Sequence, residues 1–322
     1  MRLAFAGTPE FSAEILAQLL GDPRLAHLHW AGVLTQPGRP RGRGRRPEQS
    51  AVHKRAQQAG LTVLTPSSLA SSSEEGRSAQ SWLIDQKLDL LLVVAYGLLL
   101  PTAVLQTPRH GCLNLHTSLL PRWRGAAPIQ RALQANDTQT GVCLMQMESG
   151  LDTGPIWAQS VVPITMQDNF GSLSDRLLQE SVGLVTEFLL APAFGHRLPR
   201  PQSEEGVVYA HKIRAEDQEL SFMASAREVF GQIRALDPSP AARTSLHGKP
   251  LKCGGVSLIM ETGQWGEPGE VLALPSSSQG LKLACAQGVV AIDWLQQAGG
   301  KRLAVQDFCR GHRLSLGDRF GG

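Results

Sequence analysis

The sequence contains few residues that could stabilise a fold through covalent or metal bonds. Its 322 residues include only five cysteines, an odd number scattered along the chain, and no C-x-x-C pair. This usage argues against a disulfide framework and against a zinc site, and it is typical of proteins in a reducing compartment. We therefore expect a cytoplasmic protein without a metal ion.

Long hydrophobic runs and a strong excess of one charge are also missing. The longest apolar stretch, residues 88–100, is interrupted by Asp89 and Gly97. It is shorter than the roughly 20 residues that span a bilayer. The chain opens on strand-like residues without the layout of a signal peptide. Because the net charge is only +3, the chain is not a bulk polycation. We expect no membrane contact.

The first half of the chain alternates strand-like and helix-like segments. The apolar segments 3–6, 31–34, 62–64 and 88–95 are typical of strands, and the last resembles a central parallel strand buried on both faces. Thr8 is a suitable N-cap for the first helix, with Pro9 at its first position. The pattern predicts a Rossmann-like, open, mostly parallel α/β sheet. The G-x-G-x-x-G fingerprint of dinucleotide sites is absent.

A second domain is predicted after a change in composition. Helical spacing over 172–190 closes a first domain of residues 1–190, and the Pro- and Gly-containing stretch 191–206 is interpreted as a linker. Residues 207–322 contain one helix followed by short strands with Gly-rich turns, which indicates a small β-barrel.

Three residues form the candidate catalytic set. Asn114 and His116 are two apart on a predicted strand, so their side chains leave the same face. Asp152 follows in the glycine-flanked segment 150–154. An amide donor can hold a developing oxyanion, an imidazole can accept a proton from an amine, and a carboxylate can orient and charge-balance that imidazole. Together they suit acyl transfer to an amine that attacks directly. Taken alone, such a pattern more often consists of strand-end residues that satisfy loop backbone groups, with Asp152 capping a turn.

The flanking segments 116–131, 140–142 and 150–154 strongly resemble the folate-dependent formyltransferases, and among them the methionyl-tRNA formyltransferases. The likeness extends from Phe5 to Phe308. It implies formyl transfer from 10-formyltetrahydrofolate to the α-amino group of initiator methionyl-tRNA. It also implies that the second domain is barrel-like (OB-like) and helps to hold the tRNA. We expect a monomer.

The resemblance implies a folate site as well. The backbone of Tyr96 and Gly97 would line the pterin pocket, and a second segment would contact the folate. The residues of that second segment are Ser118, Leu119, Leu120 and Pro121. The neighbouring Arg122 and Arg124 could meet either the glutamate tail of the folate or RNA phosphates.

An arginine-rich segment marks the expected RNA contact. Five arginines fall between residues 39 and 46, among Gly and Pro that disfavour regular structure. Arginine forks pair with phosphate oxygens, although a solvated basic loop would have the same composition. The resemblance matches Arg43 to an arginine tied to initiator tRNA discrimination. The predicted RNA contacts are Arg39, Arg43, Arg45, Arg46 and Lys212.

The chain departs from the family pattern at three places. Gly38 stands where an acidic residue is common, Ser221 and Phe222 replace an acidic residue and Trp, and Ala241 replaces Gly. We expect the last two departures to affect RNA docking more than chemistry. Two other functions stay open: a formyltransferase acting on glycinamide ribonucleotide or a nucleotide sugar, and a non-enzymatic RNA-binding protein built on a Rossmann-like domain.

Overall fold

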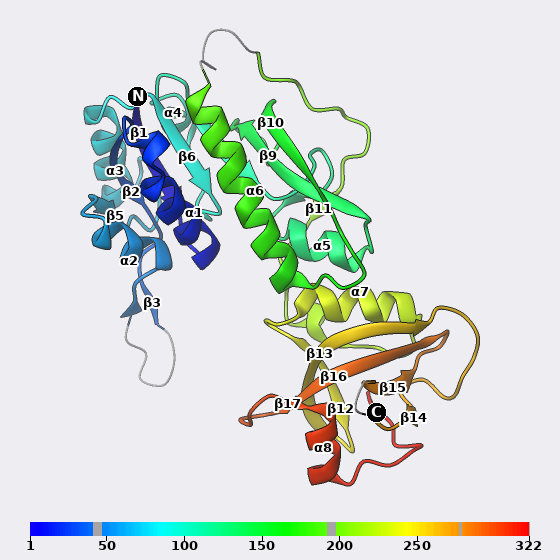
Figure 1. Cartoon of the computed structure of the whole chain (residues 1–322). Helices are drawn as coiled ribbons and strands as arrows, with labels where there is room; N and C mark the ends of the chain where they lie inside the picture. Colours follow the sequence, from blue (N-terminus) through cyan, green and yellow to red (C-terminus); the bar gives the residue numbers. More distant parts are fainter. Residues whose placement is uncertain (41–46, 192–197, 277–278, 322) are drawn as a thin grey trace. The chain divides into compact units, whose positions relative to one another are not determined.

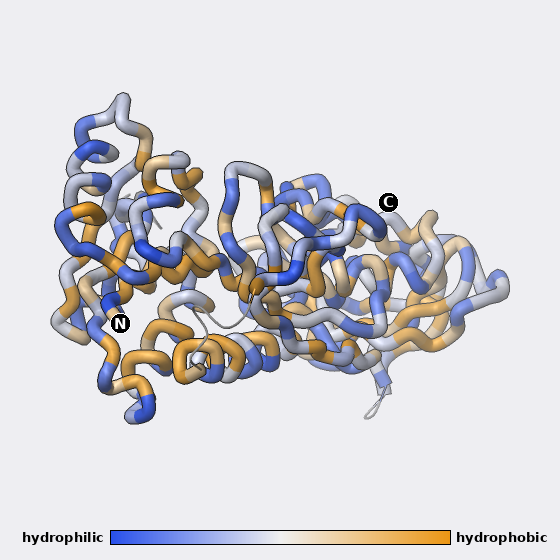
Figure 2. Tube along the Cα trace, turned by 90° about the horizontal axis from the view of Figure 1, so that it is seen from above, coloured by the Kyte–Doolittle hydropathy of each residue, from blue (hydrophilic) through white to orange (hydrophobic). Residues whose placement is uncertain are grey.

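The computed structural model describes residues 1–40, 47–191, 198–276 and 279–321 (Figure 1). These residues form two compact units that do not follow chain order. Unit 1 comprises residues 1–125, 141–162 and 176–209, and unit 2 comprises residues 126–140, 163–175 and 210–322. Figure 2 colours the same chain by hydropathy and shows hydrophobic and hydrophilic residues interleaved along the trace.

Unit 1 is built on a twisted sheet whose seven described strands have the order β10-β9-β7-β6-β1-β2-β5 (Figure 1). The strands from β7 to β5 in this order are parallel, and β9 is antiparallel to β7. This confirms the predicted Rossmann-like α/β domain. The strands are β1 (Arg2–Gly7), β2 (His29–Leu34), β5 (Val63–Leu64), β6 (Leu90–Val94), β7 (Cys112–His116), β9 (Gln139–Gln146) and β10 (Ile156–Pro163).

The direction of strand addition reverses between β1 and β6. From β1 the chain adds β2 and β5 on one side, then crosses to β6 on the other side. Ligands of open α/β sheets bind beyond the carboxyl ends of the strands at such a reversal. All five residues of β6 are buried, because the sheet is covered by helices and their connections. The helices are α1 (Glu10–Gly21), η1 (Pro23–Leu25), α2 (Ala51–Gln58), α3 (Glu74–Asp85), α4 (Thr102–Leu105) and α6 (Phe170–Leu190).

The start of α1 differs from the prediction. Helices α2 and α3 are capped by Ser50 and Ser73, whose side chains accept from backbone N–H groups three residues on. At α1 the cap position is Pro9, which makes no side-chain cap. The predicted cap at Thr8 is wrong, because the Thr8 hydroxyl donates to the carbonyl oxygen of Tyr96 at 2.8 Å. The side chain therefore joins the ends of β1 and β6.

Two two-residue ladders and one isolated bridge of the described residues lie outside the main sheet of unit 1. β8 pairs with β11, and β3 pairs antiparallel with β4 just before and after the segment 41–46. An isolated bridge joins Ile156 to Arg200. The short strands are β3 (Arg39–Pro40), β4 (Pro47–Glu48), β8 (Arg124–Gly125) and β11 (Tyr209–Ala210).

Unit 2 contains the β-rich second domain. Its described strands form one curved antiparallel sheet in the order β12-β13-β16-β15-β14, with β17 also paired to β16 (Figure 1). This confirms the predicted small barrel-like domain. The elements are η2 (Glu216–Gln218), α7 (Ala226–Leu236), β12 (Ala242–Leu246), β13 (Lys249–Met260), β14 (Val271–Ala273), β15 (Leu281–Ala284), β16 (Val289–Gln297), β17 (Leu303–Ala304) and α8 (Val305–His312).

Helix α7 connects this sheet to α5 (Pro128–Gln134). Ser225 and Glu228 form a reciprocal capping box at its start. One face of α7, including Phe230 and Ile233, is buried in the core of the sheet. On another face Gly231 allows a close approach to α5, since a Cβ there would lie 2.6 Å from the carbonyl oxygen of Gln134.

Two of the departures from the family pattern lie in this core. Phe222 is 4% exposed and Ala241 is 2% exposed. Ser221 is exposed and the expected effect on RNA docking stays a prediction, but Phe222 and Ala241 offer no direct contact, because neither side chain reaches the surface. Their effect is on packing and, at Ala241, on the backbone: its φ is +74°, in the left-handed region that favours glycine.

Candidate active site

The three predicted catalytic residues lie together beside β7, an interior strand of the sheet of unit 1. Asn114 and His116 leave the same face of β7, and Asp152 approaches from the turn after β9. The Nδ2 atom of Asn114 lies 3.4 Å from Oδ1 of Asp152, and Nδ1 of His116 lies 3.6 Å from its Oδ2. Both distances exceed the roughly 2.7–3.2 Å of an ordinary N–H···O hydrogen bond. The three groups are therefore adjacent without being tightly hydrogen-bonded to one another.

The surroundings of His116 assign different roles to its two ring nitrogens. Nε2 lies 2.9 Å from the backbone carbonyl oxygen of Trp123. Because a carbonyl oxygen only accepts, Nε2 carries the hydrogen in this contact. Nδ1 is then the nitrogen that can gain or lose a proton, and it faces Asp152. The imidazole is 6% exposed, so this geometry suits a proton acceptor whose charged form is balanced by a carboxylate.

The position of Asp152 depends on a backbone contact and on its own backbone conformation. Its Oδ2 accepts from the N–H of Gly125 at 2.8 Å. Its own φ is +52°, which is uncommon for a residue other than glycine. Gly154 has no room for a side chain, because a Cβ would lie 1.9 Å from the carbonyl oxygen of Gln146. The glycine-flanked turn predicted from the sequence therefore follows from close backbone packing.

Gln202 completes this arrangement, although the sequence did not suggest it. Its Nε2 donates to the carbonyl oxygens of Asp152 at 2.8 Å and of Gly154 at 2.7 Å. Its Oε1 accepts from Nε and Nη2 of Arg124 at 3.1 and 2.8 Å. Arg124, predicted to meet the folate tail or RNA, thus contacts a side chain of its own unit. No local pattern marks Gln202, since it lies in the stretch interpreted as a linker.

The predicted pterin segment lies beside the triad, at the carboxyl end of β6. The carbonyl oxygen of Tyr96 accepts from Thr8 and, at 2.9 Å, from Nε2 of Gln36. Gly97 has a φ of +79°, and a Cβ there would lie 2.5 Å from Gln36 Nε2. The Tyr96 ring is buried, which raises the pKa of its hydroxyl. The backbone, not the ring, is therefore available to a ligand, and Thr8 and Gln36 were missed as its supports.

The second predicted folate segment is shaped by its own internal contacts. The Ser118 hydroxyl, fully buried, donates to the carbonyl oxygen of Arg122 at 2.6 Å. Leu120 is buried in a cluster with Met145, and Leu119 lies directly over Gly141. Pro121 is half-buried. The structure thus uses Ser118 and Leu120 to fold the segment and leaves Leu119 and Pro121 more open.

Only two of the predicted RNA contacts, Arg39 and Lys212, lie within the described residues. Arg39 is exposed on β3 and donates through Nη2 to Oε1 of Gln36. Arg43, Arg45 and Arg46 lie outside the described residues. Lys212 is exposed in unit 2.

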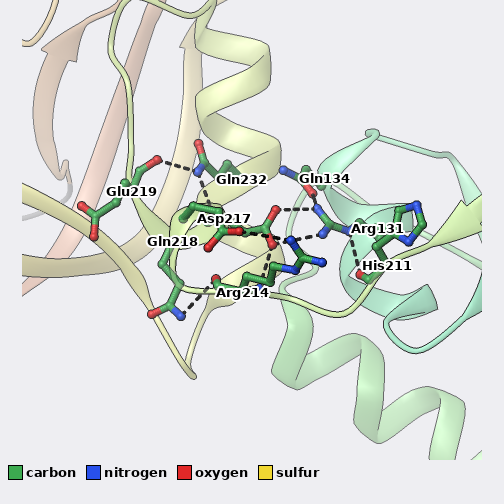
Figure 3. A network of polar contacts seen from close by, with 9 residues as sticks. Arg131, Gln134, His211, Arg214, Asp217, Gln218, Glu219 and Gln232 are labelled. Carbon is green, nitrogen blue, oxygen red and sulfur yellow. Dashed lines mark hydrogen bonds and ion pairs between the residues drawn. The ribbon is translucent and has the colours of Figure 1, made fainter.

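The segment that carries Lys212 is fixed by a polar network (Figure 3). Arg131 on α5 donates to both carboxylate oxygens of Asp217, at 3.1 and 3.2 Å, and to the carbonyl oxygen of His211 at 3.2 Å. Gln232 on α7 donates to the carbonyl oxygens of Asp217 and Glu219, both at 2.9 Å. The connection that leads into the β domain is therefore held from two helices.

Comparison with known proteins identifies the family. The family model described as "Formyl transferase" matches residues 1–189, and the one described as "Formyl transferase, C-terminal domain" matches residues 212–313. The chain belongs to the formyl transferase family. Residues Asn114, His116 and Asp152 all fall within the first matched region, and Lys212 begins the second.

Full-length relatives of this formyl transferase are similar from end to end. The chain is 44% identical over 323 residues to the methionyl-tRNA formyltransferase of Dechloromonas aromatica (strain RCB), covering 99% of both chains. It is 45% identical to that of Pseudomonas paraeruginosa (strain DSM 24068 / PA7), covering 97% of this chain and 96% of the relative.

Solved structures show the same fold at lower identity. HypX from Aquifex aeolicus, solved with tetrahydrofolic acid, has a TM-score of 0.64 and 19% identity, over 96% of this chain and 47% of that one. An N-formyltransferase from Helicobacter canadensis has a TM-score of 0.62 and 16% identity, over 94% and 99% of the two chains.

Two further features of this formyl transferase concern metal binding and membrane crossing. Within the part of the chain that the structure describes, no cluster of three or more His, Cys, Asp or Glu residues is arranged to hold a metal ion. The helices of the described residues include none that is both long and apolar enough to cross a membrane.

Proposed function

We propose that the protein transfers the formyl group of 10-formyltetrahydrofolate to the α-amino group of initiator methionyl-tRNA. The observation that carries this proposal is the Asn114, His116 and Asp152 constellation in a formyl transferase whose relatives, similar over their whole length, are named for this acceptor. Formyl transfer to an amine needs an oxyanion donor and a proton acceptor, and the site offers both.

Each residue has a defined part in the proposed reaction. The amine nitrogen bonds to the formyl carbon, the bond from that carbon to N10 breaks, one amine proton leaves and N10 gains one. Asn114 donates its second amide hydrogen to the oxyanion, because the first faces Asp152. His116 accepts the amine proton at Nδ1, directly or through water, while its Nε2 stays on the Trp123 carbonyl. Asp152 balances the resulting imidazolium.

Substrate binding is divided along the chain. The backbone of Tyr96 and Gly97 and the segment 118–121 are proposed to bind the folate, supported by their place beside the triad. The arginine segment 39–46 and Lys212 are proposed to contact tRNA phosphates. The proposed domains are residues 1–190 for catalysis, a linker 191–206, and residues 207–322 for tRNA binding. This division is supported by the separate matches of the two family models to residues 1–189 and 212–313.

One assay tests the acceptor. Purified protein is incubated with 10-formyltetrahydrofolate and, in parallel, methionyl-tRNA, glycinamide ribonucleotide and a dTDP-linked amino sugar. We expect formylation of methionyl-tRNA only. Preferred formylation of either small amine would overturn the proposed acceptor while leaving the formyl transfer itself intact. Absence of transfer to all three would overturn the activity.

We also propose that the protein works in the cytoplasm as a monomer, because translation initiation takes place there and the proposed site draws on residues of one chain. Light scattering on the purified protein tests the second point. A mass of one chain is expected, and a stable dimer would contradict it.

A further inference from the structure

The side chain of Gln202 joins the two segments that hold the Asp152 carboxylate. One segment is the turn at Asp152 and Gly154, whose carbonyl oxygens accept from Gln202 Nε2 at 2.8 and 2.7 Å. The other is β8, where Arg124 donates to Gln202 Oε1. Carbonyl oxygens only accept and a guanidinium only donates, so the two ends of this amide cannot be exchanged.

The turn has a conformation that needs such support. Asp152 has a φ of +52°, and left-handed backbone costs about 1–2 kcal/mol per residue other than glycine. Its carboxylate is 13% exposed and reaches the N–H of Gly125, the neighbour of Arg124. Gln202 therefore fixes the position of the turn relative to β8. In that position, Oδ2 of Asp152 faces Nδ1 of His116.

We propose that Gln202 is a positioning residue for formyl transfer and acts through Asp152. This inference rests on the proposed function. Gln202 touches neither His116 nor Asn114 in the described structure; it sets the backbone from which the Asp152 carboxylate reaches them. The stretch between the two matched regions is thus part of the active site, supplied from 50 residues beyond Asp152.

The first test compares two glutamines that each accept a hydrogen bond from an arginine side chain. Gln202→Ala is expected to lower kcat by about tenfold to hundredfold, the size of effect that follows from a catalytic group displaced by about 1 Å. The KM for methionyl-tRNA and the affinity for tetrahydrofolate should change little. Gln159→Ala is the control, because Gln159 on β10 accepts from Arg200 of the same stretch at 2.7 Å without contacting the turn. It should keep the wild-type kcat.

A second variant separates positioning from folding. Gln202→Glu keeps the side-chain size and the Arg124 contact, but places a carboxylate oxygen against two carbonyl oxygens. It should therefore fold and lose at least as much activity as Gln202→Ala. If Gln202→Ala does not fold, Gln202→Glu replaces it in all measurements.

A double-mutant cycle with Asp152→Asn decides whether Gln202 acts through Asp152. In the Asp152→Asn background, loss of Gln202 is expected to cost little further activity, because the group that it positions no longer works. Full additivity, or wild-type kcat in both Gln202 variants, would overturn the inference.

The test of Gln202 does not depend on which amine the protein formylates. If the wild-type protein formylates glycinamide ribonucleotide instead of methionyl-tRNA, the proposed acceptor is wrong, and the same cycle run with that amine still tests Gln202. If the wild-type protein formylates no amine, both the proposed function and the inference are overturned.

Discussion

His116 presents Nδ1 to the carboxylate of Asp152, 3.6 Å from Oδ2, while its Nε2 is engaged by a backbone carbonyl at 2.9 Å. In the proposed reaction, this arrangement leaves Nδ1 as the nitrogen that takes a proton from the substrate amine. In the proposed reaction, the charge on Asp152 is the property that balances a protonated His116.

We expect Asp152→Asn to lower kcat by about hundredfold or more, the usual contribution of general acid–base catalysis. The side-chain oxygen of Asn can still accept from Gly125, so the turn should keep its shape, but the charge that balances a protonated His116 is lost. Single-turnover rates and tetrahydrofolate affinity are the measurements. Equal losses in rate and affinity would indicate a structural role instead.

Gln36→Ala is expected to weaken folate binding by about fivefold, the equivalent of one net hydrogen bond. Gln36 is 9% exposed, and its amide supports the Tyr96 carbonyl beside Gly97. The affinity for tetrahydrofolate is measured by calorimetry. Gln49→Ala serves as the control, because the exposed Gln49 side chain contacts only the His53 side chain among the hydrogen bonds described. Unchanged affinity in Gln36→Ala would remove this turn from the folate site.

Arg43→Ala should raise the KM for methionyl-tRNA and reduce the slope of log affinity against log salt by about one unit, as for the loss of one phosphate contact. Arg43 lies outside the described residues, so this prediction comes from the composition of the segment 39–46. Filter binding at several salt concentrations measures the slope. Arg77→Ala, which alters an exposed arginine on α3, should leave it unchanged. Identical slopes for both variants would make the segment a solvated loop.

Ala241→Gly is expected to stabilise the protein by about 1 kcal/mol, because glycine adopts a positive φ without the strain of a Cβ. The φ of Ala241 is +74°. The adjacent Ala242 on β12 is a control of opposite sign: Ala242→Gly should destabilise, since strand backbone gives glycine no advantage. Urea denaturation measures both. A destabilised Ala241→Gly variant would show that lost methyl packing outweighs the relieved strain.

Asp217→Asn should destabilise the protein by about 1–2 kcal/mol at neutral pH, the value of hydrogen bonds to a charged group. Burial raises the pKa of Asp217, but the hydrogen bonds from Arg131 and from the Arg214 N–H outweigh it, so the pKa is lowered below its usual 3.8. The stabilisation is therefore complete above pH 3.8 and is lost as the pH falls through the lower folded value.

Denaturation curves of wild type and Asp217→Asn at a series of pH values check this expectation. The difference in unfolding free energy should be constant near neutral pH and shrink only in acid. A difference that grows as the pH falls would contradict the ion pair seen in Figure 3.

The alternation of apolar segments predicted the parallel sheet because buried strands and covering helices have different periods of hydrophobicity. The same spacing placed Asn114 and His116 on one face, and flanking glycines indicated a tight turn at Asp152. The cap of α1 was mispredicted because a contact distant in sequence outweighed the local pattern. Thr8 has the right type and position for a cap, but a carbonyl 88 residues away competes for its hydroxyl.

The sequence by itself indicated the formyl transferase fold and chemistry and predicted a set of candidate catalytic residues, because residue type and short spacing encode them. Only the tertiary structure decided what supports those residues. Gln36 and Gln202 are ordinary glutamines in irregular stretches, and their roles arise when strand order and a returning chain segment bring them to carbonyl oxygens 60 and 50 residues away. Hydrogen bonds of this range depend on how the chain is packed, which local sequence patterns do not record.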